Sequence, residues 1–293
     1  MPDLEPLEPG VMFWAGRDTL AEIKALGVRC GQLGIPGGLD LTAAGEAWKS
    51  DLDREAFALV TVFAAYDGES YADKPAVERT VGFIPPATRD ERERRTYEVS
   101  DFASRLGVWS VACHIGFVPE DSTDADYVAV REMVRRVCDH AARHQQVFAL
   151  ETGQEPAAVL LRFIRDVGRP NLRINFDPAN MILYGTGDPI EAWRTLAPWV
   201  ISVHAKDGDW PPGWPDKAAP DALGVERPLG QGSVGVERFV GAVAASGFRG
   251  PLNVEREAED QAERLRDIRE GVALIRRLSG GADDRLSSSV SRR

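Results

Sequence analysis

The sequence predicts a single closed (β/α)8 barrel, and three observations lead to this fold class. The chain has 293 residues, a length that fits one such barrel or two ordinary domains. Short apolar runs alternate with longer amphipathic segments eight times, as expected of strand and helix units around a parallel sheet. No change in composition marks a linker, so we expect one barrel, with an open doubly wound sheet as the alternative.

Eight apolar runs supply the expected strands. They are residues 11–14, 29–33, 59–63, 108–114, 147–151, 172–177, 200–204 and 252–255. Together with the helices between them, they place the barrel at residues 1–279. The last segment, residues 280–293, is rich in glycine and serine, and we expect a flexible tail there.

The expected helices follow from the spacing of apolar residues. In residues 124–144 and 265–278, apolar side chains recur at steps of three and four, so each segment presents one apolar face to a core. A further helix is expected at residues 236–245, after the turn GQGSVG. The charged run RDERERRTYE is expected to form an exposed helix face with internal ion pairs.

Two loops are unusually long for connections within a barrel. They are residues 64–88 and 208–232. Both follow predicted strands, which is where barrel enzymes carry their chemistry. The second loop contains several prolines together with Trp210 and Trp214, so it can either close over a ligand or form a rigid surface loop.

Composition limits the location and the partners of the protein. The formal net charge of −11 and the pI near 5.0 oppose binding to a nucleic-acid phosphate backbone. No run approaches the roughly 20 apolar residues of a membrane-spanning helix. The N-terminal segment lacks the basic start and apolar core of a signal peptide, so we expect a cytoplasmic protein. Cys30, Cys113 and Cys138 are expected to be reduced core residues.

The strongest chemical pattern lies in the second half of the chain. Glu151, Asp177, His204 and Glu255 each stand at the end of an apolar run. Their separations are 26, 27 and 51 residues; the first two match one strand and helix repeat, and the third contains the long loop 208–232. A barrel brings neighbouring strand ends together, and three carboxylates with one imidazole suit Mn²⁺, Mg²⁺, Co²⁺ or Zn²⁺. The sequence therefore predicts one divalent-metal site.

Five segments carry a family resemblance: HIGF, FALETGQE, NFDPANMILYG, SVHAKDG and PLNVERE. Through them, most of the chain resembles the sugar phosphate isomerase/epimerase superfamily of xylose isomerase-like barrels. The resemblance implies that Glu151, Asp177, His204 and Glu255 bind one divalent metal at the ends of strands five to eight, and we expect Mn²⁺ first among the possible metals. Glu257 shares a strand face with Glu255 and is the competing fourth ligand.

The resemblance also implies the chemistry. Isomerising or epimerising a keto sugar requires removal of a proton next to a carbonyl, and a metal can stabilise the enediolate that results. In the ketose 3-epimerases, which the chain resembles, the two glutamate ligands act as acid and base. We therefore expect Glu151 and Glu255 to be the catalytic pair.

Four further residues are expected to contact the substrate: His114, Asn180, Lys206 and Glu257. His114 ends the fourth predicted strand and can either donate a hydrogen bond to a hydroxyl or remain a core histidine. Lys206 can polarise a carbonyl, hold a phosphate or carboxylate, or form a salt bridge in the barrel mouth. Asn180 stands where ketose 3-epimerases commonly carry a histidine, so their substrate preference does not transfer to this chain.

Two other patterns are weaker. GQGSVG, residues 230–235, matches the dinucleotide fingerprint GxGxxG, but no buried strand precedes it, so we expect an ordinary turn. His140 and His144 stand four apart on one predicted helix, a spacing that can bind zinc. The sequence indicates no third ligand near them, so both are expected to be solvated surface residues.

Two rival functions share the expected barrel. An endonuclease IV-type phosphodiesterase uses the same Glu, Asp, His and Glu frame but needs several further histidines, and this chain has 4 in all. A sugar-binding barrel without catalysis is the second rival. The sequence leaves open the substrate, its phosphorylation and the choice between isomerase and epimerase. The expected partner is a small-molecule sugar, with no nucleic acid and no membrane, and the resemblance suggests a homodimer or homotetramer.

Overall fold

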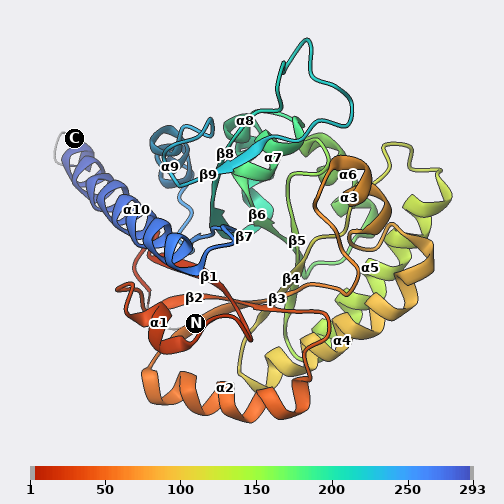
Figure 1. The fold of residues 1–293 in the computed structure, drawn as a ribbon, viewed down its shortest axis with the longest axis horizontal. Coiled ribbons are helices and arrows are strands. Elements are labelled where there is room, and N and C mark those ends of the chain that lie inside the picture. Colours follow the sequence, from red (N-terminus) through yellow and green to blue (C-terminus); the bar gives the residue numbers. More distant parts are fainter. Residues whose placement is uncertain (1–3, 291–293) are drawn as a thin grey trace.

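A computed structural model describes residues 4–290, apart from the side chains of residues 43, 44, 46 and 281–290. It confirms the closed parallel barrel, whose strands pair in the order β1-β10-β7-β6-β5-β4-β3-β2 (Figure 1). Strand β1 pairs with both β2 and β10, which closes the sheet. The barrel strands are β1 (Pro9–Trp14), β2 (Cys30–Ile35), β3 (Ala58–Ala64), β4 (Ser110–Cys113), β5 (Val147–Glu151), β6 (Leu172–Phe176), β7 (Val200–Ala205) and β10 (Leu252–Val254).

Helices cover the outside of this barrel (Figure 1). They are α1 (Leu20–Lys24), α2 (Leu41–Glu55), α3 (Lys74–Thr80), α4 (Arg89–Arg105), α5 (Ala125–Arg143), α6 (Ala157–Val167), α7 (Pro178–Tyr184), α8 (Pro189–Leu196), α9 (Val236–Ala245) and α10 (Gln261–Val290). Two 3-10 turns, Pro86–Thr88 and Ala197–Trp199, precede α4 and β7. The helices predicted at residues 124–144 and 236–245 are confirmed as α5 and α9.

Each predicted strand corresponds to a barrel strand, with differences at the ends. The strand that is shortened most is the one predicted at residues 108–114, where β4 covers only Ser110–Cys113 and His114 follows it. At the C-terminal end, α10 continues to Val290, so residues 280–290 of the expected tail belong to a helix. A helix that has already formed extends at low cost, because each added residue gains one hydrogen bond. Residues 291–293 lie outside the described residues, and the domain boundary at residue 279 stays a prediction.

The main core lies between the sheet and the helices. The apolar face predicted for α5 is buried there, with Tyr127 and Val134 fully enclosed. Cys30, Cys113 and Cys138 are all buried and free, which confirms them as core residues. Because helices pack against the outside of the sheet, the strand ends are held in fixed positions.

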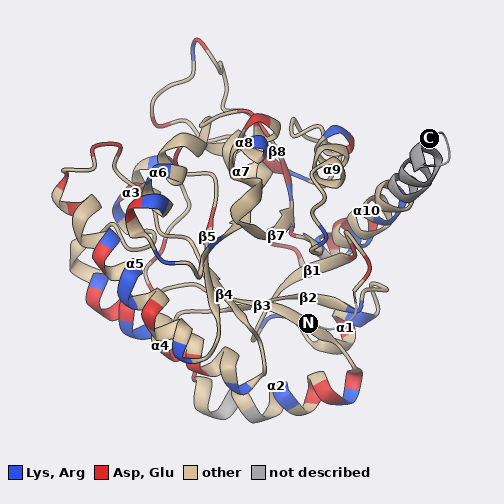
Figure 2. Ribbon diagram, turned by 180° about the vertical axis from the view of Figure 1, so that it is seen from behind, with Lys and Arg blue, Asp and Glu red and all other residues tan. Residues whose placement is uncertain are grey.

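The charged run RDERERRTYE, residues 89–98, forms the first part of α4, but it is not wholly exposed as predicted. Arg92 and Glu93 are buried. Arg92 donates to the carbonyl oxygens of Asp67 and Gly82, and Glu93 accepts from Arg136 of α5. The charges face inward because their partners lie on neighbouring segments, which the spacing within one helix does not reveal. Elsewhere along α4 and α5, acidic and basic residues are interspersed (Figure 2).

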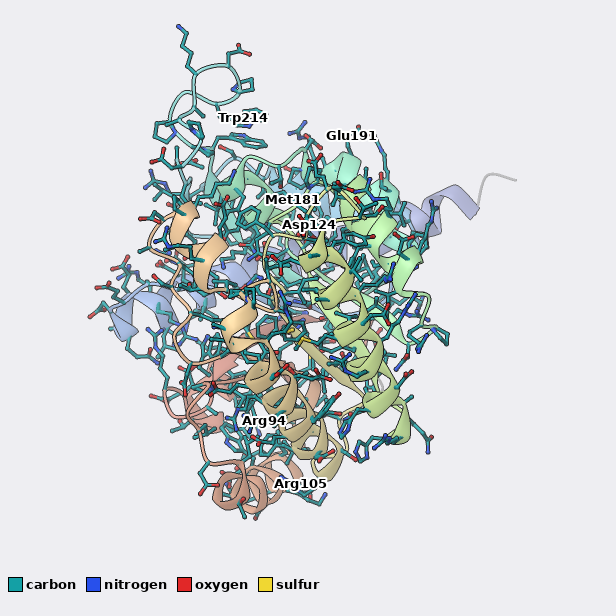
Figure 3. All side chains as sticks on the ribbon, turned by 90° about the vertical axis from the view of Figure 1, so that its right-hand side faces the viewer. Arg94, Arg105, Asp124, Met181, Glu191 and Trp214 are labelled. Carbon is teal, nitrogen blue, oxygen red and sulfur yellow. The ribbon has the colours of Figure 1, made fainter. Side chains whose placement is uncertain are left out.

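The two long loops contain secondary structure of their own. Residues 64–88 include α3 and a 3-10 turn, and residues 208–232 include the antiparallel pair β8 (Asp207–Asp209) and β9 (Val225–Arg227). In the second loop Trp210 stacks on Trp214 with ring centroids 3.6 Å apart. Figure 3 shows Trp214 in a loop that projects beyond the barrel. Closure of this loop over a ligand stays a prediction.

Among residues 4–290, no helix is long and apolar enough to cross a membrane.

Candidate metal centre

The barrel brings the four predicted metal ligands together at the carboxyl ends of its strands. Glu151 is the last residue of β5, Asp177 follows β6, His204 lies in β7 and Glu255 follows β10. One ligand atom from each side chain lies within 4.8 Å of those of the others, and all four residues are buried. The convergence expected from the sequence is therefore present, and the ligand roles themselves stay a prediction.

His204 lies at the centre of this cluster. Its Nδ1 is 2.9 Å from Glu151 Oε1 and 2.8 Å from Glu255 Oε2. On the other side of the ring, Nε2 is 3.1 Å from both Gln32 Oε1 and Asn175 Nδ2. If Nε2–H donates to this amide oxygen, the lone pair of Nδ1 is directed at the carboxylates. That is the tautomer that an ion held among these side chains requires.

Asp177 divides its two carboxylate oxygens between different tasks. Oδ1 caps helix α7 by accepting hydrogen bonds from the backbone N–H groups of Ala179 and Asn180, at 2.7 and 3.1 Å. Oδ2 is buried and has no hydrogen-bond partner among the described residues. Oδ2 lies 4.0 Å from His204 Nδ1. A buried carboxylate oxygen without a partner is costly, and a divalent cation bound here would supply one.

The charges of the cluster shift the pKa values of its members. Burial would lower the pKa of His204, but the charges of Glu255 and Glu151 outweigh burial and raise it well above its usual value. Burial raises the pKa of Asp177 well above its usual range; Lys206 opposes this rise, and Glu151 and Glu255 add to it. Without a cation, the site therefore retains protons at neutral pH. A divalent ion would replace them.

Glu151 and Glu255 show the opposite shift. Burial alone would raise the pKa of each, yet it is lowered, by His114 and His204 for Glu151 and by His204 and Lys206 for Glu255. Both glutamates are therefore ionised at neutral pH. An ionised carboxylate can accept a proton, as a general base must.

Lys206 is the cation that the protein itself brings to the cluster. Its Nζ lies 3.6 Å from Glu255 Oε1 and 3.9 Å from Asp177 Oδ2. It also lies 3.4 Å from Glu257 Oε1, whose side chain is 54% exposed. Glu255, not Glu257, belongs to the group of four. The side chain of Glu257 instead lies at the rim, beside the ammonium.

His114 and Asn180 both contact Glu151. His114 Nε2 lies 3.1 Å from Glu151 Oε2, and Asn180 donates to Glu151 Oε1 at 3.3 Å. The ring of His114 packs between Phe63 and Tyr71, each with its centroid 5.7 Å away. All the residues predicted to contact substrate thus lie at the mouth of the barrel, next to the cluster. Their contact with a substrate stays a prediction.

A layer of polar side chains inside the barrel was not predicted from the sequence. Gln32 donates to Asn175 Oδ1 at 2.9 Å and to Ser202 Oγ at 2.5 Å, and Asn253 donates to the same hydroxyl at 3.1 Å. Asn175, Ser202 and Asn253 each stand two residues before one of the metal-ligand candidates. Side chains two apart on a strand share a face, so the layer lies directly beneath the cluster. The feature of the sequence that could have revealed this layer is a polar residue within each of these short apolar runs.

The GQGSVG turn also acquires a structural role. Asp207 is buried and accepts backbone hydrogen bonds from Gly208, Gly230, Gly232 and Val234 at 2.9–3.1 Å. The glycines bring the backbone close to this carboxylate; at Gly232 an added Cβ would lie 2.5 Å from Asp207 Oδ1. The turn therefore wraps an aspartate of its own chain and fixes the end of the long loop beside Lys206.

The prediction of solvated surface residues is confirmed for His144, which is exposed, and corrected for His140, which is partly buried. Both Nε2 atoms contact Asp101 Oδ1, at 2.7 and 2.8 Å. His140 also stacks on Tyr97 with a centroid distance of 4.4 Å. Asp101 lies on the neighbouring helix α4, so the spacing within α5 could not reveal it.

Comparisons with known proteins agree with this fold. The profile of the family described as xylose isomerase-like TIM barrel matches residues 20–278. A xylose isomerase domain protein from Planctomyces limnophilus shares 39% sequence identity, with a TM-score of 0.91, over 95% of this chain and 99% of that chain. No curated protein gives a match.

More distant solved structures share the fold alone. A D-tagatose 3-epimerase-like protein has 15% identity and a TM-score of 0.72, covering 95% of this chain and 99% of its own. A xylose isomerase-like TIM barrel protein from Mycobacterium smegmatis, in complex with magnesium, has 17% identity and a TM-score of 0.65, covering 95% of this chain and 97% of its own. With the family profile and the Planctomyces relative both matching nearly the whole barrel, the chain belongs to the xylose isomerase-like TIM barrel family.

Proposed function

We propose that the protein is a divalent-metal-dependent isomerase or epimerase of a keto sugar or a related hydroxy-carbonyl compound. The observation that carries this proposal is the convergence of Glu151, Asp177, His204 and Glu255 in one buried group at the barrel mouth. Structural neighbours of the fold include an L-ribulose 3-epimerase and a D-psicose 3-epimerase. The chemistry proposed here is of the same class.

The donor set supports one hard or borderline cation, with Mn²⁺ as the first candidate and Mg²⁺, Co²⁺ and Zn²⁺ as alternatives. Glu151, Asp177, His204 and Glu255 would hold it. When bound, such a cation polarises a carbonyl and makes the neighbouring C–H more acidic. A distant neighbour in the fold was solved in complex with magnesium, one of these candidate ions.

The two glutamates reach the centre from different sides of the barrel. Strands β5 and β10 are separated by β6 and β7 in the barrel order, so Glu151 and Glu255 do not lie side by side on adjacent strands. A substrate carbon held between them can lose a proton to one carboxylate and regain a proton from the other. Their lowered pKa values leave both ionised at rest, so either can act as the base, and the carboxylate that returns a proton must first take one up from solvent. His114, Asn180 and Lys206 would orient the substrate oxygens around that carbon.

Replacement of either glutamate tests this proposal. Glu151→Gln and Glu255→Gln should each lower kcat by at least about 100-fold, because general acid–base catalysis contributes roughly 10²–10⁴. The measurement is solvent-deuterium uptake into a panel of keto sugars in the presence of Mn²⁺, followed by mass spectrometry. The control is Glu191→Gln, on the exposed surface of α8, which should react as the wild type does. Full deuterium uptake by both mouth variants would refute the catalytic pair.

The same assay separates the rival functions. The protein has 4 histidines, and only His114 and His204 lie at the mouth, whereas a three-metal phosphodiesterase site needs more. Cleavage of an abasic-site oligonucleotide without deuterium uptake would favour the phosphodiesterase. Sugar binding without exchange, measured by calorimetry, would favour a non-catalytic barrel.

A further inference from the structure

A second group of metal-ligating side chains lies outside the barrel mouth. Asp101 of α4 and the pair His140 and His144 of α5 offer one oxygen and two imidazole nitrogens within 4.8 Å of one another. Both Nε2 atoms contact the same oxygen, Asp101 Oδ1, at 2.7 and 2.8 Å. We propose that Asp101, His140 and His144 form a second divalent-metal site, of the kind that zinc occupies, with a structural role.

The donor set is chemically suited to zinc. Zinc accepts imidazole nitrogen and carboxylate oxygen at about 2.0–2.2 Å, usually with four ligands. Ligand atoms around a tetrahedral zinc ion are therefore about 3.3 Å apart, slightly more than the contacts from each Nε2 to Asp101 Oδ1. The side chains of Asp101 and His144 are 45% and 31% exposed, so a small outward rotation can admit the ion, with water as the fourth ligand. The ion would replace the protons that now link the three groups.

The two histidines are arranged for joint binding. They stand at positions i and i+4, so their side chains lie on the same face of α5, one turn apart. Tyr97 of α4 stacks on the His140 ring at an interplanar angle of 16°, which holds that ring facing α4. The third ligand comes from α4, which lies beside α5 on the outside of the barrel (Figure 1). The ion would therefore join two neighbouring helices.

The electrostatic field at the C-terminal ends of α4 and α5 also favours a bound cation. His140 lies in the last turn of α5 and His144 caps that helix, while Asp101 lies one turn before the end of α4 at Arg105. The C-terminal end of a helix carries a partial negative charge, so positive charge is stabilised there. Two charged neighbours on α5 are already paired elsewhere: Asp139 with Arg169, and Arg136 with Glu93. Neither pair occupies Asp101.

The location argues for a structural role and not for catalysis. Helices of the barrel run opposite to its strands, so the C-terminal ends of α4 and α5 lie at the rim opposite the catalytic mouth. Figure 3 agrees: Arg105, the last residue of α4, lies at the end of the molecule away from Trp214. His144 precedes β5 by only a few residues. This rim of a barrel serves stability and not catalysis, and a metal here would tie the entry to β4 and β5 together.

Metal stoichiometry tests the proposal independently of activity. The full-length protein is stripped with a chelator and titrated with Zn²⁺ in a calorimeter. Wild type should bind two equivalents, one at the mouth and one at the rim. His144→Gln should bind one, and so should Asp177→Asn, which removes a mouth ligand. The double variant should bind none with comparable affinity.

A matched control and a direct probe make the result decisive. Asp139→Asn removes an exposed acid of the same helix that pairs only with Arg169 in the described contacts, and it should keep both equivalents. In the Asp177→Asn protein, Zn²⁺ should shift the ¹⁵N signals of His140 and His144 at a ratio of one ion per chain. This measurement uses a protein with an unaltered rim, so it tests the proposal even if a rim variant fails to fold. Binding of one equivalent by wild type and none by Asp177→Asn, or unshifted histidine signals, would overturn the proposal.

Discussion

The mouth and the opposite rim of the barrel hold two groups of similar composition in opposite environments. At the mouth, three carboxylates and one imidazole are buried with the Lys206 ammonium beside them. At the rim, one carboxylate and two imidazoles are partly exposed to solvent. The comparison teaches that burial, more than composition, decides how much a missing partner costs.

The two groups also differ in what holds them in place. The mouth residues extend from four strands of a closed sheet, above a layer of buried amides and hydroxyls. The rim residues extend from the ends of two helices and are supported by a single stacked ring, Tyr97. A ligand set supported by buried hydrogen bonds is preorganised, whereas an exposed set can adjust when an ion arrives. Reaction chemistry suits the former, and a structural ion suits the latter.

Removing the mouth's own cation should produce the largest effect on folding. Lys206→Met in the metal-free protein is expected to lower the free energy of unfolding by about 3–5 kcal/mol, because buried carboxylates lose their partner. Urea denaturation in the presence of a chelator measures this loss. Saturating Mn²⁺ should restore part of the lost stability, because the ion supplies the missing positive charge.

The matched control for this change is Glu257→Gln. Glu257 is the exposed partner of the same ammonium, so its loss should cost less than about 1 kcal/mol. An equal loss of unfolding free energy in the two variants would show that the buried carboxylates do not depend on Lys206. It would contradict the view that burial makes a missing partner more costly.

Much of the mouth could be predicted from the sequence because its geometry is periodic. Glu151, Asp177 and His204 each follow an apolar run at the interval of one strand and helix, and parallel strands carry such residues to a common edge. The resemblance then assigned them chemical roles. The exact ends of a strand do not follow from this spacing, so the predicted strand 108–114 is longer than β4.

The residues that sequence reasoning missed are brought together only by the fold. Gln32 is 172 residues from His204, and Asp101 is 39 residues from His140. Gln32 interrupts an apolar run without any charge, and Asp101 resembles every other acid on an amphipathic helix. Asp207 was part of a quoted motif, but its four backbone donors come mainly from a loop more than 20 residues away. Contacts of this kind depend on closure of the barrel, not on local pattern.

Removing the amide of Gln32, beneath His204, tests whether the buried polar layer holds the mouth residues in place. Gln32→Leu removes the acceptor 3.1 Å from His204 Nε2, so the imidazole loses one of the contacts that orient its ring. Affinity for Mn²⁺ at the mouth is expected to fall about 10–100-fold. Calorimetric titration checks this, with Ser110→Ala as the control, because Ser110 bonds Thr61 inside the same barrel and touches no metal-ligand candidate. Equal affinities for the two variants would exclude a positioning role for Gln32.

The pH dependence of stability separates the two groups further. Folding raises the pKa of both His204 and Asp177, so the folded protein holds protons that the unfolded chain releases. Stability from His204 is fully present below its unfolded pKa of about 6.5 and is lost as pH rises toward its folded pKa. Metal-free protein should therefore lose stability as the pH rises above about 6.5, by up to about 1.4 kcal/mol per pH unit for each proton.

Bound Mn²⁺ should flatten this dependence, because the ion displaces the protons from the mouth. Denaturation midpoints measured across that pH range, with chelator and with Mn²⁺, provide the test. His144→Gln should keep the steep slope of the metal-free protein, since the slope originates at the mouth. A slope that persists unchanged with saturating metal would place its origin elsewhere in the protein.

The smallest effect is expected at the rim without metal. Asp101→Asn removes the acceptor shared by His140 and His144, yet these groups are partly exposed, so the free energy of unfolding should change by less than about 1 kcal/mol. Burial would raise the pKa of Asp101, but hydrogen bonds from His140 and His144 lower it. Its contribution to stability is therefore present above about pH 4 and is lost below that.

Adding Zn²⁺ should reveal a difference between the intact and the altered rim. In an Asp177→Asn background, the ion should raise the melting temperature of the protein with an intact rim but not that of Asp101→Asn. A large loss in the absence of metal would mean that the rim, like the mouth, depends on its ion pairs for folding, and that exposure does not separate the two groups.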